Sequence, residues 1–188
     1  GVALRRTVRR ERLMETVASL APCLIGMETG SGAHEWARRF EVLGHTVRLM
    51  APKFVSPYRR NAKNDGTDAE AICEAVTRPG MRFVPIKSVE QQAVLSLHRV
   101  RQGFIEDRTG TINRIRGLLS EFGVVLPLRS DVVRRKAHAA LEELPALARR
   151  AIEDLCAHLR DLDAKVLAYD REIHLQARQS GPDRRLMR

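Results

Sequence analysis

Three acidic residues are placed where their carboxylates could act together. Glu28 ends an apolar segment, 23–27, that is typical of a buried strand. Asp65 and Asp68 lie at the entrance of an expected helix, and residues three apart meet on one helix face. Neighbouring carboxylates repel one another unless a hard cation such as Mg²⁺ or Mn²⁺ neutralises them. The pattern therefore suggests a metal site, where the ion would activate the attacking oxygen of phosphodiester chemistry and stabilise the leaving one.

A purely structural explanation of the same acids remains open. Thr67 and Glu70 fit the capping box of a helix N-terminus, and Asp68 in a first turn would stabilise the helix dipole. Asp65 precedes a glycine in a common turn dipeptide. Glu28 could simply end a strand. Spacing alone does not decide between a metal site and a helix cap.

An α/β arrangement is expected to position these acids. Segments 23–27 and 46–50 are predicted to be strands, and apolar residues recur at helical spacing over 33–43 between them. This order predicts parallel strands joined by a helical crossover. A further helix is expected over 67–77 and a short extended segment over 82–85. The first acid then lies at the carboxyl end of a strand, which is the edge where such sheets bind ligands.

The second half of the chain is expected to be helical. A long helix is predicted over 88–122 and a polar helical segment over 130–143. Beyond them, apolar residues repeat at heptad spacing, with β-branched residues at three a positions, which favours two-stranded pairing. This seam consists of Ile152, Leu155, Leu159, Leu162, Val166, Tyr169 and Ile173. It could pack on a second copy of the chain or on the 88–122 helix of its own chain, and both possibilities stay open.

The composition is strongly basic and favours a nucleic-acid partner. Lys and Arg total 33 against 23 Asp and Glu, so the formal net charge is +10. Arginine binds phosphate in a bidentate manner, which places nucleic acid ahead of an anionic membrane. Tyr58, Arg59, Arg60 and Lys63 form an aromatic and cationic patch suited to a DNA or RNA strand, although a solvated loop explains it nearly as well. No apolar run approaches the roughly 20 residues of a membrane span.

Several short motifs carry a family resemblance. The sequence reads GME at 26–28 and GAHEWA at 32–37, KNDGTDAEAI at 63–72, and RPGMRFVP at 78–85. With further similarity at 90–93 and 113–123, these motifs resemble the DEDD transposases of the insertion-sequence-110 family of bacterial mobile elements. The combination is specific, whereas any single motif would be weak.

The resemblance implies a fold, a site and partners. The implied fold is an α/β, ribonuclease H-like (RuvC-like) domain over 1–122, without its first strand, followed by a helical coiled-coil arm over 123–188. Four acids bind divalent metal in this family, in the order Asp, Glu, Asp, Asp. Glu28 matches the Glu, and Asp65 and Asp68 match the last two Asp, so these residues are the implied metal-binding and catalytic side chains. The implied cofactor is Mg²⁺ or Mn²⁺. The implied partners are DNA, a guide RNA and further copies of the chain through the coiled coil, in the bacterial cytoplasm at the nucleoid and without a membrane.

Two parts of the family pattern have no counterpart in this sequence. The first Asp would lie on a strand before Gly1, and a domain with a nucleophilic Ser would follow Arg188. We therefore expect a piece truncated at both ends that does not complete transposition by itself. Two alternatives remain open. One is a non-catalytic nucleic-acid-binding remnant that joins oligomers of an intact transposase, and the other is a resolvase-like nuclease for branched DNA.

Overall fold

The chain divides into two units, Gly1–Ser88 and Val89–Arg188. The computed structural model describes residues 5–59 and 65–179, and only the backbone at Asp65 and Gln179. The division precedes the long helix, whereas the resemblance implied a domain boundary after residue 122. The reason is that the long helix packs within the second unit.

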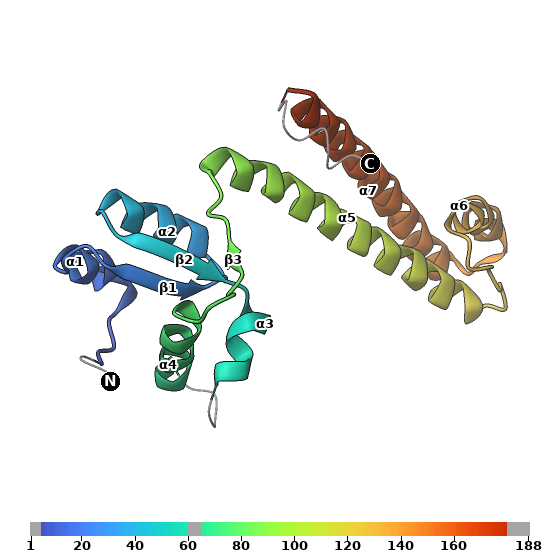
Figure 1. The fold of residues 1–188 in the computed structure, drawn as a ribbon. Helices are drawn as coiled ribbons and strands as arrows, with labels where there is room; N and C mark the ends of the chain where they lie inside the picture. The colour runs from blue at the N-terminus through green and yellow to red at the C-terminus, as the bar shows by residue number, and fades with distance from the viewer. Residues whose placement is uncertain (1–4, 60–64, 180–188) are drawn as a thin grey trace. The chain divides into compact units, whose positions relative to one another are not determined.

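The first unit is built on a small mixed sheet covered by helices (Figure 1). Its elements are η1 (Arg10–Arg12), α1 (Leu13–Ala18), β1 (Leu24–Glu28), α2 (Ala33–Val42), β2 (Thr46–Met50), α3 (Pro52–Val55), η2 (Ser56–Tyr58), α4 (Asp65–Val76) and β3 (Phe83–Val84). β1 and β2 are parallel and α2 connects them, which confirms the expected strand–helix–strand order. β3 adds to β2 in the antiparallel direction, so the strand order within the described residues is β1-β2-β3.

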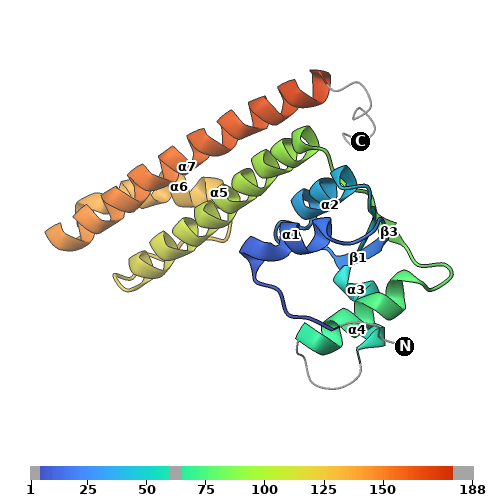
Figure 2. The same cartoon turned by 90° about the vertical axis from the view of Figure 1, so that its left-hand side faces the viewer.

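Helices cover both faces of this sheet (Figures 1 and 2). On one face, α1 and α2 pack around the buried side chains of Phe40 and Leu49. On the other face, α3 and α4 pack around Met50 and Ala71. Leu49 and Met50 are adjacent in β2 and serve different cores, because successive strand side chains point to opposite faces.

α4 begins earlier than the sequence pattern predicts. The expected helix started at Thr67, whereas α4 starts at Asp65. Thr67 and Glu70 therefore lie inside the helix and do not occupy the two positions of a capping box. The Glu70 carboxylate pairs with Arg5. The capping box is thus not formed as predicted, whereas Asp68 still lies in the first turn of α4, where a carboxylate stabilises the helix dipole.

The second unit is helical. Its elements are α5 (Val89–Ser120), α6 (Ser130–Ala139), η3 (Ala140–Glu143) and α7 (Ala146–Gln179). α5 and α7 lie side by side and run in opposite directions (Figures 1 and 2). Val133 of α6 is buried in the same core as Ile115 of α5 and Ile152 of α7, so all three helices share one core. Although two of these helices are long, none in the described part of the chain is apolar enough to cross a bilayer.

The heptad seam of α7 is buried inside this unit. Four seam residues are at most 5% exposed: Ile152, Leu159, Leu162 and Val166. Leu159 belongs to the same apolar cluster as Ile112 and Leu119 of α5. This is the intramolecular hairpin, one of the two arrangements that the sequence left open. The other three seam residues, Leu155, Tyr169 and Ile173, are only partly buried.

Polar and aromatic contacts hold the helical unit together. Arg134 of α6 binds Asp163 of α7 in a bidentate manner, with Nε 2.8 Å from Oδ2 and Nη2 2.7 Å from Oδ1. Arg108 of α5 approaches the same carboxylate, with Nη1 3.5 Å from Oδ1. The rings of Phe104 on α5 and Tyr169 on α7 meet edge to face, 5.5 Å between centroids. These contacts give the hairpin its register, because each requires one alignment of the helices.

Candidate functional site

The acids predicted to bind metal come from two elements of the first unit. Glu28 is the last residue of β1, and Asp68 lies in α4. Their side chains are 24% and 25% exposed, so both are largely shielded from water. Asp65 is the first residue of α4, and its side chain is outside the described residues. The structure thus describes two of the three predicted carboxylates.

A single guanidinium joins these two carboxylates. Arg59 directly follows η2. Its Nη2 donates a hydrogen bond to Glu28 Oε2 at 2.9 Å, and its Nε lies 2.8 Å from Asp68 Oδ1. The Arg59 side chain is itself only 25% exposed. Two acids far apart in the sequence therefore converge on one cation, which offsets their mutual repulsion.

The contact between Arg59 and Asp68 is an ion pair without hydrogen-bond alignment. Arg59 Nε and Asp68 Oδ1 are both buried, and neither finds a hydrogen-bond partner among the described residues. A buried polar atom that lacks a partner destabilises a fold, and such atoms are uncommon in native proteins. Asp68 Oδ1 therefore retains the capacity to bind a further donor or a cation.

A glycine sets the distance between β1 and α4. A Cβ at Gly26 would lie 3.0 Å from Val76 Cβ and 3.2 Å from Ile72 Cγ2, so the helix rests directly on the strand. Asp68, Ile72 and Val76 share one face of α4 because they are four residues apart. Gly26 and Glu28 share one face of β1 because strand side chains alternate. Packing of α4 on the glycine therefore brings the two carboxylates together.

The donor set of this site suits a hard divalent cation. Carboxylate oxygens are preferred ligands of Mg²⁺ and Mn²⁺. Asp68 Oδ1 accepts no aligned hydrogen bond among the described residues and lies 2.8 Å from the Arg59 guanidinium, which also binds Glu28. Within the described residues, no three His, Cys, Asp or Glu side chains are grouped as metal ligands. The two described acids fit a metal site as a pair, and the third ligand of the family pattern, Asp65, has no described side chain.

The aromatic and cationic patch predicted from the sequence separates into parts. Arg59 is engaged by the acids, and Arg60 and Lys63 lie outside the described residues. Tyr58 lines a hollow of 280 Å³ on the first unit. The hollow is lined by Lys53, Phe54, Pro57, Tyr58, Pro79, Gly80, Met81 and Arg82.

Cations stack on two aromatic rings of this hollow. Lys53 Nζ lies 5.0 Å from the centroid of Phe54, and the Arg78 guanidinium lies 5.7 Å from the centroid of Tyr58. The Glu74 carboxylate beside Arg78 raises the pKa of this arginine, which stays charged. Sequence reasoning identified Tyr58 and missed Phe54, although an aromatic four residues earlier beside a lysine was a usable signal. The arrangement offers ring faces and positive charge, the combination that binds a nucleic-acid strand.

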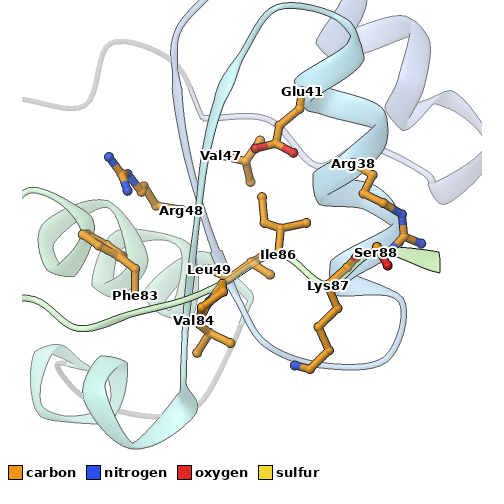
Figure 3. A pocket seen from close by; sticks show the side chains of 11 residues that line it. Arg38, Glu41, Val47, Arg48, Leu49, Phe83, Val84, Ile86, Lys87 and Ser88 are labelled. Carbon is orange, nitrogen blue, oxygen red and sulfur yellow. Dashed lines mark hydrogen bonds between the residues drawn. The ribbon is translucent and has the colours of Figure 1, made fainter. Parts of the chain in front are cut away.

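A wider groove of 590 Å³ is lined by residues of α2, β2, β3 and the segment that follows β3 (Figure 3). Figure 3 shows Arg48 beside Phe83, and the guanidinium lies 5.1 Å from the ring centroid. Arg38 donates to the Lys87 carbonyl at 2.5 Å from the other side of the groove. Sequence reasoning missed this groove, because only the antiparallel pairing of β3 with β2 brings its residues together. Glu28 and Asp68 do not line it, and its lining includes one carboxylate, that of Glu41.

Comparisons with known proteins all lead to transposases. A family model described as transposase, of the DEDD type named for IS110, matches residues 5–124. A probable family 20 transposase of Pseudomonas aeruginosa is 43% identical over 195 residues, which cover 99% of this chain and 56% of that relative. The transposase for insertion sequence element IS1328 of Yersinia enterocolitica is 39% identical over 171 residues, with coverage of 90% and 51%. That for IS1111A of Coxiella burnetii is 36% identical over 188 residues, with coverage of 94% and 50%.

The three relatives match at least 90% of this chain, but the matched part is only about half of each relative. The chain spans about half the length of the curated relatives it matches. No solved structure matches it. The family model covers the acidic residues, the glycine beneath α4 and all of α5. The chain belongs to the DEDD transposases of the insertion-sequence-110 type.

Proposed function

We propose that this segment supplies the metal-binding site of a transposase that breaks and joins phosphodiester bonds of DNA when an insertion sequence moves. The observation that carries the proposal is the convergence of Glu28 and Asp68 on Arg59. Helix caps and strand ends do not require two acids from separate elements to share a cation. A metal site built from both elements would bring them together in this way.

In this proposal Glu28, Asp65 and Asp68 hold Mg²⁺ or Mn²⁺. A bound ion of this kind activates an attacking oxygen and stabilises a leaving oxygen at phosphorus. The chain contributes the positions of the carboxylates, which β1 and α4 hold together through Gly26. It also keeps the Glu28 and Asp68 side chains about three-quarters shielded from water, where charge interactions are stronger than in bulk solvent.

The proposal extends to a ribonuclease H-like (RuvC-like) fold for the first unit. Its support is the parallel pair β1 and β2 with α2 between them, helices on both faces, and an acid at the carboxyl end of β1. Ligands of such sheets bind at that edge. The short β3 lies within the extended segment expected over 82–85, whereas its antiparallel pairing with β2 and the groove beside it were not predicted.

DNA is the proposed substrate, bound at the nucleoid. Its support is the formal net charge of +10 and the aromatic and cationic hollow around Tyr58 and Phe54. A guide RNA and further copies of the chain are partners that the family pattern implies.

A transposition assay in bacteria tests the proposal. Glu28→Gln and Asp68→Asn, placed in the reading frame that encodes this segment, are expected to abolish transposition. Each removes a charge that binds metal and keeps the shape of the side chain. Glu15→Gln is the matched control, because Glu15 is exposed and pairs only with Arg12 among the described residues. Normal transposition by either site variant at matched protein levels would contradict the proposal.

A further inference from the structure

We propose that Arg59 is the resident counter-ion of the Glu28 and Asp68 pair. In this role it holds the two carboxylates together before a divalent cation binds, and it leaves them when the cation arrives. The inference rests on the proposed metal site and assigns a further residue to it. Sequence reasoning had grouped Arg59 with the nucleic-acid patch instead.

The contacts of Arg59 differ from those of an ordinary surface arginine. Two different nitrogen atoms of one guanidinium reach two acids, on β1 and on α4, at 2.9 and 2.8 Å. Arg38 in the same unit is equally shielded, at 22% exposure against 25%, yet its ion pair involves one acid, Glu35, on its own helix. The bridge made by Arg59 therefore organises two elements, whereas the Arg38 pair is local.

Competition between Arg59 and a metal ion follows from the shared oxygens. Glu28 Oε2 accepts a hydrogen bond from the guanidinium, and Asp68 Oδ1 faces its Nε. An ion bound to both acids would compete with the guanidinium for these oxygens, or would repel it from the neighbouring oxygens of the same carboxylates. Only the fraction of molecules in which Arg59 has left the carboxylates is competent to bind the ion. The free energy needed to break the bridge therefore weakens the apparent affinity for the ion.

The bridge also has a role without metal. If Arg59 is removed, two carboxylates remain close together without a cation, which is unfavourable for the fold. A divalent cation should replace the missing charge. Loss of stability in the absence of metal, combined with a gain in metal affinity, is the signature of a counter-ion. A merely structural arginine would lose stability and gain no affinity.

Mn²⁺ binding to the full chain tests this role. Free Mn²⁺ is measured by electron paramagnetic resonance during titration of the unmodified chain, Arg59→Met, Arg38→Met and Asp68→Asn. Thermal unfolding is recorded for each with and without Mn²⁺. We expect Arg59→Met to bind Mn²⁺ roughly tenfold more tightly, a change equivalent to the loss of two modest ion pairs. It should unfold at a lower temperature without Mn²⁺ and gain more from Mn²⁺ than the unmodified chain. Arg38→Met should bind like the unmodified chain.

The outcomes separate this inference from the proposed function. If the unmodified chain binds Mn²⁺, Asp68→Asn does not, and Arg59→Met binds no more tightly than the unmodified chain, the counter-ion role is overturned and the metal site stands. If neither the unmodified chain nor any variant, including Arg59→Met, binds Mn²⁺ more tightly than Asp68→Asn, both the counter-ion role and the proposed metal site are overturned.

A conservative variant covers the case in which Arg59→Met does not fold. Arg59→Lys keeps one positive charge, and a single ammonium cannot reproduce the two-armed contact of a guanidinium. It should therefore show a smaller gain in Mn²⁺ affinity, in the same direction. An affinity equal to or weaker than that of the unmodified chain would reject the role on this variant alone.

Discussion

Gly26 of β1 and Val76 of α4 lie so close that a methyl group on the glycine would be 3.0 Å from the Val76 Cβ. This contact, with no catalytic atom in it, determines where the acidic site forms. Asp68 is two helical turns before Val76, and Glu28 follows Gly26 on the same side of its strand. The distance between helix and strand therefore determines the distance between the carboxylates.

Gly26→Ala should destabilise the first unit. The added methyl group would meet Val76 and Ile72 at 3.0 to 3.2 Å, which forces α4 away from β1. Overpacking of this kind costs about 1–3 kcal/mol of unfolding free energy, which urea denaturation can measure. Gly30→Ala is the matched control, since nothing lies within 4 Å of a Cβ at Gly30. Equal stability of the two variants would show that α4 does not rest on Gly26.

Leu159→Asp should unfold the helical unit. Leu159 is 2% exposed in the core that α5, α6 and α7 share, and an isolated charge buried there costs several kcal/mol. Circular dichroism during heating should show helix loss at a lower temperature. Leu167→Asp, on the same helix at 51% exposure, should change little. Sedimentation tests the alternative in which the seam pairs with a second copy. If the unmodified chain is a dimer and Leu159→Asp is a folded monomer, the seam joins two chains.

Binding of nucleic acid should depend strongly on salt. With a net charge of +10, affinity for duplex DNA or structured RNA should fall about tenfold or more between 50 and 200 mM salt if several phosphates are contacted. Lys53→Ala and Arg82→Ala, in the hollow around Tyr58, should weaken binding and flatten this dependence. Arg12→Ala removes the same charge from an exposed position paired with Glu15, and should leave the dependence closer to that of the unmodified chain. An affinity that does not change with salt would exclude electrostatic binding.

Cys156 should be the slowest cysteine to react with iodoacetamide. Burial raises the pKa of its thiol, and Glu153 adds to this rise while Arg160 opposes it. A raised pKa leaves less reactive thiolate at neutral pH, so alkylation should be slow there and accelerate as pH rises. Cys23 and Cys73 are exposed and serve as internal references in peptide mapping by mass spectrometry. Equal rates for all three in the folded chain would show that the core on which α7 packs does not shield Cys156.

The order of strands and helices in the first unit was within reach of the sequence. The run 46–50 was predicted as a strand and is β2, and the apolar spacing over 33–43 matches α2 closely. These predictions succeeded because local apolar periodicity reports which side of each element is buried. Glu28 and Asp68 were identified through family motifs, and the structure brings their carboxylates to one guanidinium.

The partners of these elements were decided only by the tertiary structure. The heptad pattern defined an apolar stripe on α7, but a stripe does not specify which helix covers it, and α5 of the same chain does. Arg59 was read as part of a nucleic-acid patch, because local sequence does not show where a long side chain in a loop will point. It turns to two acids, one 31 residues before it in the sequence. That arrangement depends on packing α4 against Gly26, a contact between distant segments that no local pattern encodes.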